Sequence, residues 1–106
     1  MSKDITLRNG FRLAHGDFQR IKVALSDPAV FSSCVVRADL VRKALDPENY
    51  SIEGSNATFL REKGILDADS QMSVEMQNMI SVIYGLDSDV ELEPNACPYP
   101  TFDNIA

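Results

Sequence analysis

The sequence predicts a single, mainly α-helical domain with a small β element. A chain of 106 residues has the size of one domain. Apolar residues recur at helical spacing in several segments, and one Asn-Gly pair joins two short alternating segments. We therefore expect an N-terminal β-hairpin at about residues 4–14, followed along the chain by four to five short helices. A strand at about 88–93 is expected as an optional addition to the hairpin, before an extended tail that contains prolines.

The expected division of the chain is a compact helical domain over residues 1–86 and an acidic, Pro-containing tail over 87–106. The tail differs in composition, since PNACPYP holds three prolines in seven residues, which excludes a helix there. The segment SDVELEP alternates apolar and acidic residues, which is typical of a strand with one solvated face.

The hairpin segment ITLRNGFRL allows two registers. A two-residue Asn-Gly loop would divide the apolar side chains between the two faces. A three-residue loop that ends at Gly10 pairs Ile5 with Leu13. The same register pairs Leu7 with Phe11 and places all four apolar side chains on one face. We therefore expect the three-residue loop.

The first helical segments carry recognisable start signals. Asp17 is expected to cap the helix FQRIKVALS, and Asp27 followed by Pro28 predicts the start of the next helix. A break is expected between Arg37 and Asp39, because Asp39 can cap a second piece. The apolar residues expected to share a face are Val30, Phe31, Cys34 and Val35.

Two further helices are expected in the second half. GSNATFLREKGIL reads as a short helix capped at Ser55 or Asn56. The last helix is expected to start at Ser70 or Ser73 and to stop at Gly85. Its apolar stripe, which core packing explains better than a docking groove, consists of Met72, Met76, Met79, Ile80 and Ile83.

Charge is distributed unevenly along the chain. Residues 1–63 hold ten basic and eight acidic side chains, a net +2, whereas residues 64–106 hold eight acidic side chains and no base, a net −8. Two interpretations remain open: neutralisation of one half by the other within the fold, or steering of a basic partner. Nucleic acid and membranes are not expected as partners, because the pI is about 4.6 and no long apolar stretch occurs.

Few residues suggest catalysis or metal binding. His15 is the sole histidine, and a helix-junction role explains it better than catalysis with Cys34. Because the start MSKDITLRNG has no apolar run, a cytoplasmic location is expected, with Cys34 as a buried thiol and Cys97 as an exposed thiol. The acidic stretches DADSQ and DSDVELE lack the EF-hand positions for glycine and glutamate. No catalytic, cofactor or metal site is therefore expected.

The function expected from these patterns is that of a small, acidic, non-catalytic protein-binding module: a subunit, adaptor or inhibitor that acts through its acidic half and tail. The expected partner is another protein with a basic surface, and a homo-oligomer is left open. The alternative is a precursor peptide with a folded helical leader and a tail that a partner enzyme modifies or cleaves. A small enzyme using His15 or Cys34 is the weaker third hypothesis. The residues expected to bind the partner are Asp87, Asp89, Glu91, Glu93, Cys97, Tyr99 and Phe102.

Overall fold

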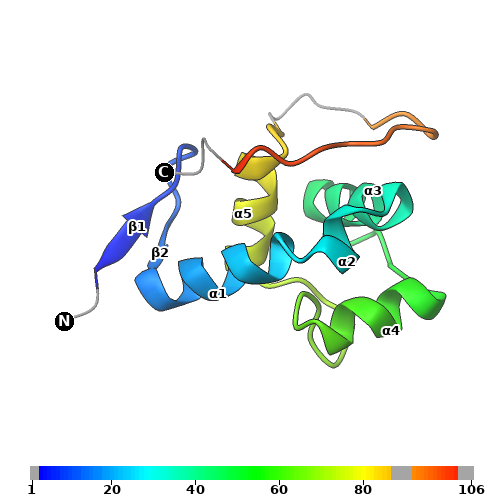
Figure 1. Ribbon diagram of the computed structural model, residues 1–106, viewed down its shortest axis with the longest axis horizontal. Helices are drawn as coiled ribbons and strands as arrows, with labels where there is room; N and C mark the ends of the chain where they lie inside the picture. The colour runs from blue at the N-terminus through cyan, green and yellow to red at the C-terminus, as the bar shows by residue number, and fades with distance from the viewer. Residues whose placement is uncertain (1–2, 87–91, 103–106) are drawn as a thin grey trace.

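A short β-hairpin leads into five helices in the computed structural model, which describes residues 3–86 and 92–102 (Figure 1). The elements are β1 (Asp4–Thr6), β2 (Arg12–Ala14), α1 (His15–Leu25), α2 (Pro28–Phe31), α3 (Cys34–Leu45), α4 (Gly54–Glu62) and α5 (Val74–Ile83). The Cα radius of gyration of 13.0 Å is that of a compact chain of this length. The predicted helical class and N-terminal hairpin are thus confirmed.

The hairpin adopts the register with the three-residue loop. Ile5 lies opposite Leu13, and the Leu7 N–H donates a hydrogen bond of 2.8 Å to the Phe11 carbonyl. Gly10 closes the loop with φ of +90°, which favours glycine. Leu7 and Leu13 are buried in the core, so the apolar face of the hairpin packs on the helices. The predicted register is confirmed.

Gly10→Ala is expected to lower the free energy of unfolding by about 1 kcal/mol, because an alanine side chain disfavours a positive φ. Gly16→Ala is the matched control. Gly16 lies in α1 without a positive φ, and no atom lies within 4 Å of the Cβ that alanine would add, so this change should raise stability by about 0.5 kcal/mol. Urea unfolding of both variants measures the difference. Equal effects of the two changes would contradict the left-handed conformation of Gly10.

The predicted N-terminal cap is wrong for α1 and correct for α2. α1 begins at His15, two residues before the expected cap, and no side chain caps it. Asp17 instead lies in the first turn and pairs with Arg20 at 3.3 Å, so the predicted cap is wrong. Asp27 does cap α2: its carboxylate accepts a 2.9 Å hydrogen bond from the Ala29 N–H. That N–H, followed by the Lys63 ammonium, lowers the pKa of the Asp27 carboxyl.

α3 is continuous, and the break expected between Arg37 and Asp39 is wrong. The chain turns earlier, where the Ser33 hydroxyl caps α3 by accepting a hydrogen bond of 3.3 Å from the Val36 N–H. Asp39 does not cap a helix. Its carboxylate accepts hydrogen bonds from the Tyr50 hydroxyl at 2.6 Å and from the Asn56 amide at 2.9 Å. The carboxylate therefore holds the segment after α3 against that helix.

The apolar face expected across residues 30–35 does not form. Val30 is fully buried at the end of α2, whereas Cys34 and Val35 are exposed at the start of α3. The turn at residues 32–33 separates two helices, so the helical spacing that related these side chains in the sequence does not relate them in space.

Of the last two helices, α4 lacks the predicted cap, whereas α5 is capped by one of the two predicted serines. α4 begins at Gly54 after Glu53, without a side-chain cap, so the caps expected at Ser55 or Asn56 are wrong. α5 is capped by Ser73, whose hydroxyl accepts a hydrogen bond of 3.1 Å from the Met76 N–H. The predicted apolar stripe is buried as expected, but its first residue, Met72, precedes the cap and so lies outside α5.

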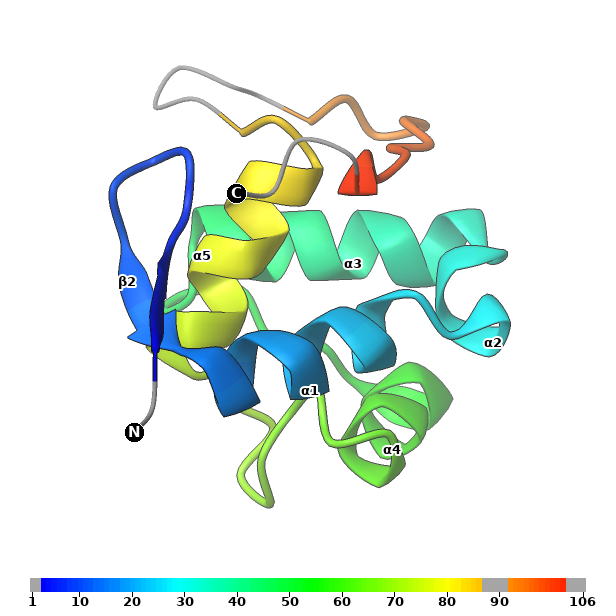
Figure 2. The same cartoon turned by 60° about the vertical axis from the view of Figure 1, so that its left-hand side comes forward.

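The core lies where α5 packs against α3 and α1 (Figure 2). Its fully buried side chains include Ile21, Leu40, Leu60, Met79 and Ile80. Burial of such residues is the main stabilising term of a helical domain. None of the helices that the structure describes has the length and apolar character needed to cross a membrane.

Residues 92–102, called the arm below, run over α3 and the end of α5 (Figures 1 and 2). The Thr101 N–H donates a hydrogen bond of 2.5 Å to the Ile83 carbonyl, and Phe102 packs half-buried against the core. Most of the strand expected at 88–93 falls outside the described residues, and Leu92 and Glu93 are not in a strand. The division into residues 1–86 and 87–106 stays a prediction.

Candidate functional site: the disulfide and the arm

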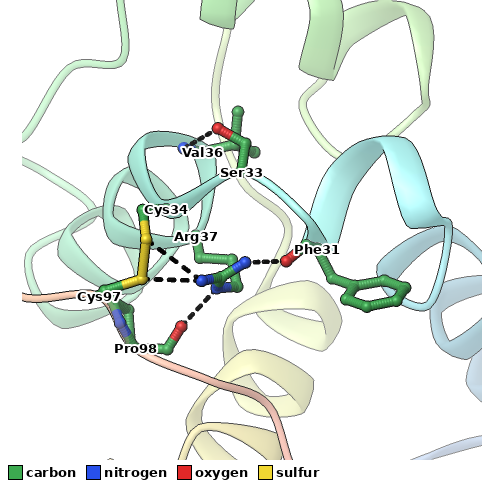
Figure 3. The surroundings of a disulfide bond; sticks show 7 residues. All are labelled: Phe31, Ser33, Cys34, Val36, Arg37, Cys97 and Pro98. Atoms are coloured by element: carbon green, nitrogen blue, oxygen red, sulfur yellow. Dashed lines mark hydrogen bonds between the residues drawn. A yellow bond between two sulfur atoms is a disulfide. The ribbon is translucent and has the colours of Figure 1, made fainter.

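A disulfide joins Cys34, the first residue of α3, to Cys97 of the arm (Figure 3). The expectation of two reduced thiols is therefore wrong, as is the expected burial of Cys34, which is exposed. The two cysteines are 63 positions apart in the sequence, so they do not form a short motif that would have indicated this bond. Only the return of the chain over α3 brings the two Cα atoms to 5.0 Å.

Arg37 lies directly beneath the disulfide and is 1% exposed. Figure 3 shows its guanidinium between the two cysteines and two backbone carbonyls. It donates to the carbonyls of Phe31 and Pro98, the second at 2.5 Å. Its Nη2 also lies 2.8 Å from the Cys97 sulfur and 3.4 Å from the Cys34 sulfur. One buried cation thus contacts α2, α3 and the arm.

The guanidinium of Arg37 also covers the ring of Tyr99, with 4.1 Å to the ring centroid. Tyr99 itself is 70% exposed, so one face of its ring binds the cation while much of the side chain faces solvent. Within residues 3–86 and 92–102, no carboxylate lies within ion-pair distance of Arg37. Because burial of a charge is costly unless it is compensated, the carbonyls, sulfurs and aromatic ring together must hold this cation.

Tyr84 follows α5 near this cation. Burial raises the pKa of Tyr84 to about 12, while the positive charge of Arg37 acts in the opposite direction. The folded-state pKa of Tyr84 lies above its ordinary value of 10, so the buried neutral phenol contributes to the free energy of unfolding. This contribution is fully present below pH 10. It is lost as the pH rises through about 12.

An alkaline titration should therefore contain a component near pH 12 that Tyr84→Phe removes. Absorbance at 295 nm reports tyrosinate alone, because the chain has three tyrosines and no tryptophan. Circular dichroism recorded in parallel should show that the wild-type protein loses more stability between pH 10 and 12 than the variant does. Tyr50→Phe is the control and should keep the component near pH 12, although burial and the Asp39 carboxylate raise the pKa of Tyr50 as well. A titration unchanged by Tyr84→Phe would contradict the assignment.

Arg42 forms a second attachment for the arm. Its guanidinium donates hydrogen bonds of 3.2 Å to the carbonyls of Glu93 and Pro94. Between these two attachments a groove of about 340 Å³ separates α3 from the arm, bounded by Cys34, Val35 and Arg42 among others. Two arginines of one helix thus hold the arm mainly by its backbone carbonyls, and the side chains of Glu93 and Tyr99 stay exposed.

The residues expected to bind a partner are distributed as follows. Three of them, Asp87, Asp89 and Glu91, lie outside the described residues. Glu93 and Tyr99 are exposed on the arm, and Cys97 is in the disulfide. Phe102 faces the core. The structure thus brings Cys97 and Tyr99 together at one cation.

Sequence reasoning did not identify Arg37 and Arg42 as part of this site. One signal was present in the segment CVVRADLV, where a single cation stands among apolar residues of a buried helix. Such a cation must find acceptors in the fold. The sequence alone does not say that two of these acceptors, the Pro98 carbonyl and the Cys97 sulfur, come from about sixty positions away.

His15 and Cys34 are not placed to act together. His15 begins α1, whereas Cys34 follows α2, which lies beyond the other end of α1. Eleven helical residues span about 16 Å at 1.5 Å per residue. In the part of the chain that the structure describes, no three His, Cys, Asp or Glu side chains gather in a way that could hold a metal ion.

Comparison with family models, curated proteins and solved structures yields no match for this chain. The fold and the site therefore define the class by themselves: a small helical domain whose C-terminal arm is attached to α3 by a disulfide and two arginines.

Proposed function

We propose that this chain is a small, acidic, non-catalytic protein-binding module that acts through the outer side of its arm. The observation that carries the proposal is the way in which the arm is attached. Hydrogen bonds from Arg37 and Arg42 use backbone carbonyls of the arm. The exposed side chains of Glu93 and Tyr99 consequently remain accessible to a partner.

Attachment of the arm favours binding because it reduces the conformational entropy that a partner would otherwise have to overcome. Tyr99 suits a contact residue, since tyrosine offers a large rigid surface with a polar end and is enriched at interfaces. Val35, which is 63% exposed and borders the groove beside the arm, adds an apolar neighbour.

The proposed partner is a protein with a basic surface. The segment of residues 64–106 carries a net charge of −8 without a single basic side chain, and the arm belongs to it. Complementary charge accelerates association and is weakened by salt. Whether the module acts as a subunit, an adaptor or an inhibitor depends on that partner, and a second copy of the chain stays open as a further occupant.

Capture from the native host tests the proposal with two matched double variants. Glu93→Gln with Tyr99→Ala removes one charge and one exposed apolar group from the arm. Glu48→Gln with Val23→Ala removes one charge from an exposed loop and a smaller apolar group of similar exposure from α1. Recovery of a stoichiometric partner is expected to fall at least about tenfold for the arm variant and less than about twofold for the control. Equal recovery would overturn the arm as the binding surface.

Intact mass measured in the same capture separates the alternative. Processing confined to residues after Gly85 would favour a precursor whose tail is the product of a modifying enzyme. A small enzyme using His15 or Cys34 stays the weaker hypothesis. The cytoplasmic location is also part of the proposal. In that location the Cys34–Cys97 disulfide would be a transient or redox-sensing bond, because disulfides in reducing compartments are usually of that kind.

A further inference from the structure

We propose that the Cys34–Cys97 disulfide is a thiol–disulfide exchange site for low-molecular-weight thiols. In this site Cys34 is the sulfur under attack, and Arg37 stabilises the Cys97 thiolate that departs. The inference concerns the covalent chemistry of the bond and does not depend on a protein partner.

The position of Arg37 carries the first part of the inference. A disulfide needs no cation, since it has no charge, yet the Nη2 of a fully buried guanidinium lies 2.8 Å from Cys97 Sγ and 3.4 Å from Cys34 Sγ. A thiolate at either sulfur would pair with this cation. The arrangement therefore favours the reduced form of the site, in which charge develops on sulfur.

The helix and the groove carry the second part. Cys34 is the first residue of the twelve-residue helix α3, and the positive end of a helix dipole stabilises a thiolate there. The groove of about 340 Å³ reaches Cys34 from the side of Val35 and Ala38. Its volume is within the range of small-molecule sites. Both cysteines are exposed, so a small thiol can reach the bond without unfolding of the domain.

The exchange takes place in two steps. The thiolate of an incoming small thiol attacks Cys34 Sγ and forms a mixed disulfide. The Cys34–Cys97 bond breaks, and its electron pair leaves on Cys97 Sγ beside Arg37. A second small thiolate then attacks the sulfur of the first small thiol. This step releases a small-molecule disulfide and leaves Cys34 as a thiolate. In balance, two small thiols are oxidised, their two protons pass to solvent or to the cysteines, and the protein disulfide gains two electrons.

Equilibration of the full chain with mixtures of reduced and oxidised glutathione tests the role of Arg37. Removal of the cation destabilises the thiolates, so Arg37→Gln is expected to lower the equilibrium constant for reduction at least about fivefold. A purely structural role predicts the opposite sign, because a loosened arm makes the disulfide easier to reduce. Arg42→Gln is the matched control. It removes another arm contact without touching sulfur and should leave the constant within about twofold or raise it. An increased constant for Arg37→Gln would overturn the proposal.

A second measurement uses the wild-type chain and so does not depend on the folding of any variant. Brief exposure of the native protein to reduced glutathione, followed by an acid quench and peptide mapping, traps the mixed disulfide. Glutathione is expected on Cys34 without added denaturant. Glutathione on Cys97 alone, or no exchange until urea unfolds the domain, would overturn the assignment. Neither measurement involves a protein partner, so failure here is distinct from failure of the proposed binding function.

Discussion

Cys97→Ser is expected to lower the free energy of unfolding by about 4 kcal/mol under non-reducing conditions. The disulfide closes a loop with a sequence separation of 63, and for loops of this length the loss of chain entropy in the unfolded state amounts to about 4 kcal/mol. Urea unfolding measured by circular dichroism determines the change. The slope of the transition should also rise, because the unfolded variant exposes more surface than a cross-linked chain.

The control for this prediction is the partner cysteine. Cys34→Ser should lower stability by the same amount, and the double variant should be no less stable than either single variant, because all three lack one and the same bond. A loss below about 1 kcal/mol, or additive losses in the double variant, would contradict a disulfide between these two residues in the native protein.

Leu40→Ala is expected to lower the free energy of unfolding by about 3 kcal/mol. Leu40 is fully buried on α3, and α3 packs against α5 in the centre of the core. Truncation removes the transfer free energy of the leucine side chain and leaves a cavity that the surrounding helices fill only in part. Thermal and urea unfolding of the variant measure the loss.

Val35→Ala, on the same helix, is the matched control for Leu40→Ala. Val35 is 63% exposed, so its truncation should change stability by no more than about 0.5 kcal/mol. Similar losses for the two variants would contradict the orientation of α3. The comparison is informative because the spacing of apolar residues predicts an apolar face through Val35 that the structure does not contain.

Local signals in the sequence were sufficient for much of the fold. The hairpin register followed from the alternation of apolar residues around Gly10, since a shift by one residue would have exposed them. The cap of α2 at Asp27 followed from the hydrogen-bonding capacity of that side chain. For the start of α5 the sequence left Ser70 and Ser73 as alternatives, and Ser73 is the cap. The buried face of α5 followed from helical spacing, which acts within a few residues.

The cap predictions that failed involved a choice between equivalent local signals. Several side chains can cap a helix, and the sequence does not say which will have a tertiary partner instead. Asp39 carries such a signal but binds Tyr50 and Asn56 across the fold. Ser33, which carries an equivalent signal, provides the cap and places the turn before α3.

The sequence by itself determined a small helical domain with an N-terminal hairpin, an apolar α5 and a strongly acidic C-terminal half. Each of these properties depends on composition or on neighbours a few positions apart, so the order of residues is enough to specify it. Only the tertiary structure decided that Cys34 meets Cys97 and that Arg37 lies beneath both sulfurs. These contacts join positions about sixty residues apart, and their geometry depends on how α3, α5 and the arm pack together, which no local pattern encodes.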